Sequence, residues 1–127
     1  MADNEDSSRP HKPRKAFHLA ASQIRDVARG YGACVASDRI TVDGARVGYC
    51  YREPPEFAED GGWRFLAGDE SQDYTDRTEN FGLYDGNTVA NYDPDVIPLL
   101  DAPLGSAFER DGERGFVVIR GWRPEDG

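Results

Sequence analysis

The chain has 127 residues, a formal net charge of −9, 38% hydrophobic residues and 31% charged residues. This length suits one domain whose core is large enough to fold without disulfides or metals. Residues 1–15 hold four basic and three acidic residues, so the remainder carries 11 basic and 21 acidic residues. Such an acidic body repels phosphate backbones, which argues against nucleic-acid binding and favours a basic partner.

The rarest residue types exclude several kinds of chemistry. Only two histidines are present, His11 and His18, and no lysine follows Lys15. Cys34 and Cys50 match no zinc or redox spacing, so we expect small buried thiols that stay reduced. We therefore expect no enzyme activity, no metal and no cofactor. With no signal-type or membrane-spanning apolar stretch, a cytoplasmic protein without a membrane partner is expected.

The first third of the chain predicts a tail, a helix and a hairpin. Residues 1–15 are polar with two prolines and predict a disordered tail ahead of a single domain over residues 16–123. Apolar spacing predicts a short helix over residues 22–29. Residues 33–36 and 47–51 then read as strands joined by an Asp43-Gly44 turn.

The middle of the chain predicts a loop, a strand and a helix. Two prolines end the preceding strand, and residues 63–67 form an apolar strand. Asp69 stands at an N-cap position with Gln72 three residues later, which is typical of a capping box. A helix over residues 70–77 would thus explain the paired acids Asp69 and Glu70 without any catalytic role.

The last third alternates turn residues with short apolar runs. Asp85 to Asn87 predict a turn and Thr88 to Tyr92 a helical turn. Asp93 should cap a further helical segment, with Pro94 at its first position. Residues 105–110 and 115–122 then predict two strands joined by a turn at Asp111, before a frayed terminus at 124–127. The pattern favours an α+β domain with a twisted, mainly antiparallel sheet of about five strands and two to four short helices.

Functional motifs are sparse. The segment from Asp69 to Asn80 lacks the glycine and glutamate of a calcium loop. As a nucleophile, Cys34 or Cys50 would need an activating base, and only His18 could serve. With 21 acids in the body, some carboxylate pair will always lie at a catalytic distance, so such a pair carries little information.

A protein interface is the leading hypothesis for residues 53–79, which hold nine acids and two arginines. Aromatic and arginine side chains commonly anchor interfaces. Strand alternation places Tyr49 and Tyr51 towards the core with Val47, and Arg52 outward. The candidate partner-binding residues are Arg52, Glu56, Asp60, Trp63, Glu70, Asp73, Tyr74 and Asp76.

A small-ligand or regulatory module is the alternative. The stretch from Tyr84 to Pro94 could line a pocket in which amide and hydroxyl groups orient a polar ligand. Its candidate residues are Tyr84, Asn87, Asn91 and Tyr92. If they instead bond to local backbone, they are turn and cap residues.

Four segments in order resemble one bacterial family. They are "GACVASDRIT", "VGYCYRE", "GWRFLAGDE" and "YDGNTVANYDPDVIPLL". Together they are similar to the immunity protein 33 family, also catalogued as domain of unknown function 2185, over roughly residues 32–110. Cys50 and Gly61 depart from its pattern. The resemblance implies a polymorphic toxin system in which the protein binds and blocks a cognate toxin, and it brings no catalytic residues. It leaves the oligomeric state open.

Overall fold

The computed structural model describes residues 15–123 of the 127-residue chain. The predicted frayed end and, apart from Lys15, the predicted tail lie outside this range. Twelve short elements follow one another: η1 (Ala21–Gln23), β1 (Ala33–Ser37), α2 (Asp38–Thr41), β2 (Tyr49–Arg52), β3 (Asp60–Leu66), α3 (Gln72–Thr75), η2 (Thr78–Asn80), β4 (Phe81–Asp85), α4 (Gly86–Tyr92), η3 (Pro94–Leu99), β5 (Ala107–Asp111) and β6 (Gly115–Val118).

One six-stranded sheet organises the fold, in the order β4-β1-β3-β2-β5-β6. Only the β1–β3 pair is parallel, and the other four pairs are antiparallel. The α+β class with a mainly antiparallel sheet is therefore confirmed, with six strands in place of about five. The additional strand is β4, in a stretch whose turn residues concealed it.

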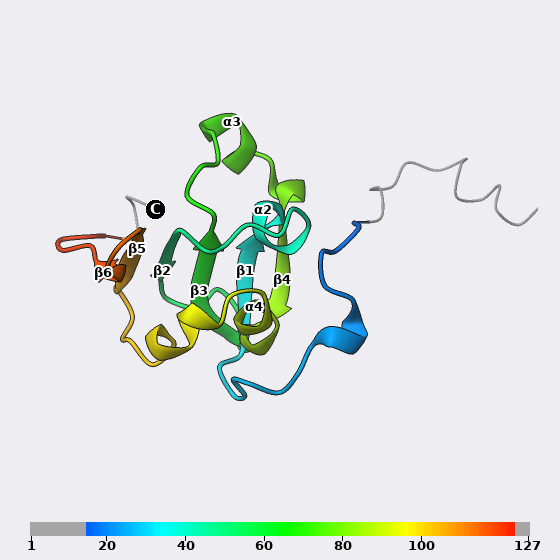
Figure 1. Ribbon diagram of the computed structural model, residues 1–127. Helices are drawn as coiled ribbons and strands as arrows, with labels where there is room; N and C mark the ends of the chain where they lie inside the picture. Colours follow the sequence, from blue (N-terminus) through cyan, green and yellow to red (C-terminus); the bar gives the residue numbers. More distant parts are fainter. Residues whose placement is uncertain (1–14, 124–127) are drawn as a thin grey trace, which may run out of the picture.

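α2, α4 and η3 gather on one face of the sheet, with the core beneath them, whereas α3 lies beyond the end of the strands (Figure 1). Side chains from alternate strand positions meet α4 and η3 there. Trp63 is 2% exposed, stacks on Phe65 and donates its indole N–H to the Leu100 carbonyl. Cys34 and Cys50 are buried in the same layer, as predicted, and burial is the main cause that raises the pKa of each thiol to about 12.

The predicted hairpin over residues 33–51 is wrong. β1 pairs with β3 and β4, whereas β2 pairs with β3 and β5. The chain leaves β1 at Ser37, whose hydroxyl accepts from the Arg39 N–H and so begins α2. Gly44 then donates to the Ile40 carbonyl, so the Asp-Gly pair ends a helix and does not reverse a strand.

The predicted helix over residues 22–29 is also wrong, because that segment bonds elsewhere. Beyond η1, the backbone N–H groups of residues 25, 27 and 28 donate to side chains of α4 and not to carbonyls of their own segment. Residues 15–29, named the strap here, run along the β4 side of the domain (Figure 1).

Local caps are predicted better than pairings. Asp93 caps η3 by accepting from Asp95 N–H, with Pro94 at the first helical position, as expected. Asp111 joins β5 to β6 through its bond from Glu113 N–H, also as expected. The cap of α3, however, is Ser71, which accepts from Tyr74 N–H. Asp69 instead accepts two bonds from the Arg39 guanidinium, at 2.6 and 3.1 Å.

Candidate functional site

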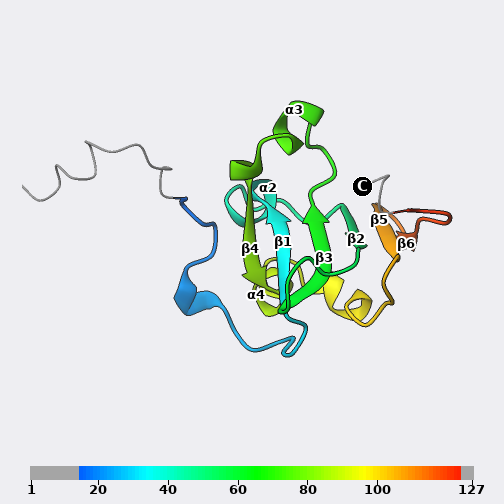
Figure 2. The same cartoon turned by 180° about the vertical axis from the view of Figure 1, so that it is seen from behind.

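One face of the sheet is left uncovered by the helices, as Figure 2 shows from behind. This surface is named the open face. Strand register assigns alternate residues to it, because partners directly opposite each other share a face. Val35 opposes Leu83 and Arg64, and Arg64 opposes Tyr51. The side chains of the open face are Val35, Tyr49, Tyr51, Arg64, Leu66, Phe81 and Leu83.

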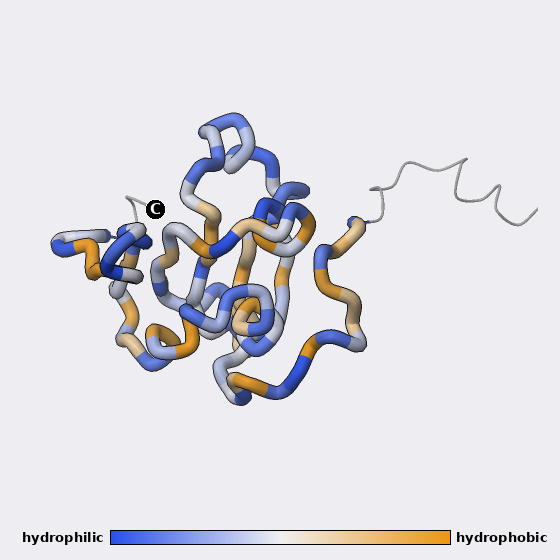
Figure 3. The backbone as a smooth tube through the Cα atoms, viewed as in Figure 1, coloured by the Kyte–Doolittle hydropathy of each residue, from blue (hydrophilic) through white to orange (hydrophobic). Residues whose placement is uncertain are grey.

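A hollow of about 510 Å³ is recessed into the open face. Tyr49 and Tyr51 from β2 and Phe81 from β4 form part of its wall. The loop around α3 adds a mostly hydrophilic border (Figure 3). Its lining residues are Val35, Tyr49, Tyr51, Glu53, Glu56, Arg64, Phe65, Leu66, Gly68, Glu70, Gln72, Thr75 and Phe81.

Arg64 lies at the floor of the hollow and is almost fully engaged. Its Nε donates to Glu53 at 2.6 Å, and its two terminal nitrogens donate to the two oxygens of Asp60 at 2.9 and 2.8 Å. The Arg64 side chain is 7% exposed and that of Asp60 is fully buried. The Arg64 hydrogen bonds hold the pKa of Asp60 well below its usual range, so the pair stays ionised. Its role is to fix the floor.

The rim acids differ in what they bind. Glu70 accepts from the backbone N–H groups of Ala67 and Gly68, at 2.8 and 2.9 Å, which closes the turn after β3. Glu56 is exposed, and its carboxylate forms no ion pair within residues 15–123. The hollow therefore presents carboxylates whose charge no lining cation offsets.

The two tyrosines of the hollow's wall are held by a third aromatic residue, Trp122. Trp122 packs at a tilt against Tyr51 with ring centroids 4.8 Å apart, and its indole donates to the Tyr49 hydroxyl at 2.8 Å. Burial, followed by the nearby charge of Glu53, raises the pKa of Tyr51 to about 12. Both tyrosines therefore lie opposite the core, contrary to the predicted direction.

The physical reason for this reversal is the chain's course at Gly48. Val47 is fully buried, and Gly48 donates to the Leu66 carbonyl as the chain enters β2. A Cβ at Gly48 would lie 2.0 Å from the Ala67 carbonyl oxygen. Cys50 therefore faces the core instead of Tyr49 and Tyr51.

Three of the candidate partner-binding residues serve the interior. Trp63 is in the core, and Asp60 is buried with Arg64. Arg52, expected to point outward, lies over the Trp63 ring and donates to the carbonyls of Gly61 and Ala102. These three side chains are therefore left out of the binding surface proposed below.

The other five candidates lie around the hollow and α3. Glu56 and Glu70 line the hollow itself. Asp73 and Asp76 are exposed at α3, where Asp76 accepts from the Gln72 side chain. Tyr74 is half-buried and packs edge-on against Phe81, with ring centroids 6.2 Å apart.

The alternative candidates hold the strap in place. Asn87 accepts from Val27 and Ala28 N–H and donates to the Arg25 carbonyl, and Asn91 binds Arg25 in both directions. Their side chains thus bind backbone far away in sequence, and Asn91 also donates to the Asn87 carbonyl within α4.

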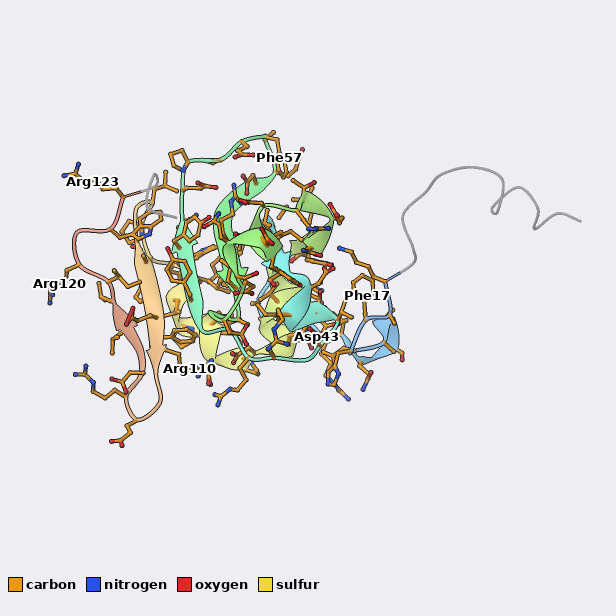
Figure 4. All side chains as sticks on the ribbon, turned by 90° about the horizontal axis from the view of Figure 1, so that it is seen from above. Phe17, Asp43, Phe57, Arg110, Arg120 and Arg123 are labelled. Atoms are coloured by element: carbon orange, nitrogen blue, oxygen red, sulfur yellow. The ribbon has the colours of Figure 1, made fainter. Side chains whose placement is uncertain are left out.

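Tyrosines anchor the beginning of the strap. Tyr92 accepts from Leu19 N–H, and Tyr84 meets the Phe17 ring edge-on at 5.9 Å. Figure 4 shows Phe17 on the strap, at the opposite end of the molecule from Arg120 and Arg123. The polar groups of the predicted ligand site are therefore used in attaching the strap.

Sequence reasoning missed Arg64 and Phe81, which line the hollow, and Trp122, which packs against its tyrosines. Gly48 was the available signal for the reversed direction of the β2 side chains, since a glycine within a strand pattern marks a close backbone approach.

Within residues 15–123, no cluster of three or more histidines, cysteines and acids is arranged to hold a metal ion. In the same range, no helix has the length and apolarity needed to cross a bilayer.

Comparison with known families gives one match. The Immunity protein Imm33 domain matches residues 34–120, which include β2 to β6 and all of β1 but Ala33, and exclude the strap and Trp122. No curated protein and no solved structure matches the chain.

Proposed function

Since the chain belongs to the Imm33 immunity protein family, we propose that it neutralises a cognate toxin by stoichiometric binding through the open face. The observation that carries this proposal is the composition of that face. An antiparallel sheet that faces water normally presents polar side chains there. Here Leu83 is 61% exposed on β4, beside half-buried aromatic and aliphatic residues.

A contiguous apolar surface rimmed by charges marks an interaction site. The open face also has the aromatic centre and charged margin common in protein interfaces. Tyr49 and Tyr51 supply rigid aromatic area, and Glu56 adds exposed negative charge at the edge. A basic toxin fits this charge, which would also accelerate its association.

Binding without catalysis suits the same surface. Both cysteines are buried with raised pKa values, so neither supplies a thiolate at neutral pH. The ion pair at the hollow's floor fixes Arg64 and Asp60 against each other. We therefore propose inhibition by occlusion of the toxin.

Two matched substitutions test the proposed surface. Leu83→Asp places a charge on the open face, whereas Val118→Asp places it on β6, where Val118 is 58% exposed. Val118 opposes Phe108, whose ring stacks on Trp63, so its side chain lies on the face opposite to Leu83. Both sites are exposed, so both variants should fold.

The assay is calorimetric titration of the full chain with the toxin encoded at the same locus, together with growth rescue on co-expression. We expect Leu83→Asp to weaken binding by about tenfold or more, ~1.4 kcal/mol, and to reduce rescue. Val118→Asp should retain both. Loss of binding in Val118→Asp alone, or in neither variant, would contradict the proposal.

A further inference from the structure

The hollow combines an aromatic wall with an excess of carboxylates. Tyr51 and Phe81 contribute rings, while Glu53, Glu56 and Glu70 contribute acids. Its volume of about 510 Å³ lies within the range of small-ligand sites and can admit a long side chain. The chemistry of these walls indicates what such a side chain should be.

The charge of the hollow is the first argument. Arg64 is its one lining cation among the described residues, and its charge is already offset by Glu53 and Asp60. Glu56 and Glu70 have no cation partner within residues 15–123. An incoming cation would therefore find carboxylates that no resident charge satisfies, whereas an anion would be repelled.

The aromatic wall is the second argument. Cations bind the faces of aromatic rings, and a planar guanidinium also stacks on them. Tyr51 is held between Trp122 and Tyr49, with centroid distances of 4.8 and 5.5 Å, so its ring is fixed in place. The raised pKa of its hydroxyl is consistent with burial and a negative surrounding field.

Guanidinium satisfies both features better than ammonium does. It presents five N–H donors in a plane, so it can bind carboxylates at its edge while its face lies on a ring. We propose that the hollow is an anchor site for an arginine side chain of the partner protein. This proposal rests on the function proposed above, and it identifies the chemical group that the open face recognises.

The test uses a small probe, so it needs no toxin. The ¹⁵N-labelled full chain is titrated with N-acetyl-arginine amide and, as a matched neutral probe, with N-acetyl-citrulline amide. We expect saturable shifts of the backbone signals of Tyr49, Tyr51, Leu66 and Gly68 with the arginine probe. A ligand of this size should reach about millimolar affinity, and the citrulline probe should bind about tenfold more weakly.

A variant pair locates the interaction. Glu56→Gln removes one unpaired carboxylate and should weaken the arginine probe about threefold, whereas Glu113→Gln, an exposed acid in the β5–β6 turn, should leave it unchanged. Equal binding of both probes, shifts confined to another surface, or no shift at all would overturn the arginine site. Such a result would not refute toxin binding through the open face. The Leu83→Asp and Val118→Asp pair tests that proposal separately.

Discussion

Replacing Asp60 with asparagine tests the ion pair that supports the floor of the hollow. Each carboxylate oxygen accepts two hydrogen bonds: one oxygen binds Gly62 N–H and Arg64, the other binds Glu56 N–H and Arg64. An asparagine has the same shape, but one of its two oxygens becomes an NH₂ group. In either orientation, that donor faces two other donors.

The cost follows from the bonds lost. Two hydrogen bonds to a charged acceptor contribute about 1.5 kcal/mol or more each, so we expect a loss of about 3 kcal/mol. This expected loss lies at the lower end of the range for breaking a buried ion pair, because Glu53 still neutralises Arg64 at 2.6 Å. For a domain of this size it corresponds to a decrease in Tm of about 12 °C.

Urea unfolding followed by the fluorescence of buried Trp63 measures the loss without adding salt. The matched control is Asp76→Asn, at an exposed position whose bond in the structure comes from the Gln72 side chain. It should change the free energy of unfolding by less than about 0.5 kcal/mol. A loss below about 1 kcal/mol in Asp60→Asn, or equal losses in both variants, would refute the reasoning.

Four further outcomes are expected. Because Arg64 lowers the pKa of Asp60, the ionised Asp60 carboxylate should stabilise the fold fully above about pH 4 and progressively less as pH falls further. Asp60→Asn should flatten this pH dependence of the free energy of unfolding in acid unfolding curves. Tyr51 should ionise near pH 12, so a 295 nm titration should lose a step near this pH in Tyr51→Phe; ionisation of Tyr51 at the ordinary tyrosine pKa of about 10 would contradict its burial. Gly48→Ala should destabilise the domain by about 2 kcal/mol in urea, because the new Cβ meets a backbone oxygen at 2.0 Å. Asn87→Ala should release the strap and accelerate tryptic cleavage after residue 25 by about 30-fold, since three hydrogen bonds are lost, and an unchanged rate would show that the strap is held otherwise.

Two local features, a helix start and a turn, were the part of the fold that the sequence predicted best. The Asp93-Pro94 helix start and the turn at Asp111 depend on neighbours within a few residues, so their chemistry is legible in the chain itself. The parallel pairing of β1 with β3 brings Ala33 opposite Asp60, and no local pattern encodes that contact. The supposed hairpin failed for this reason.

The candidate site was predicted in composition more than in geometry. The acidic stretch does border the hollow, through Glu56 and Glu70. Trp63 was misplaced because an isolated aromatic residue suits a core and an interface equally well. The asparagines of α4 were predicted to orient a ligand or to serve as turn and cap residues, because the strap that they bind lies about 60 residues earlier in the chain.

The most direct test of toxin binding through the open face is hydroxyl-radical footprinting of the protein, alone and with its cognate toxin. We predict that the toxin suppresses oxidation of Tyr51, Phe81 and Leu83 on the open face. Phe17 and Val27 on the strap are 47% and 46% exposed and should be oxidised equally in both samples. Protection of the strap with an unchanged open face would contradict the account.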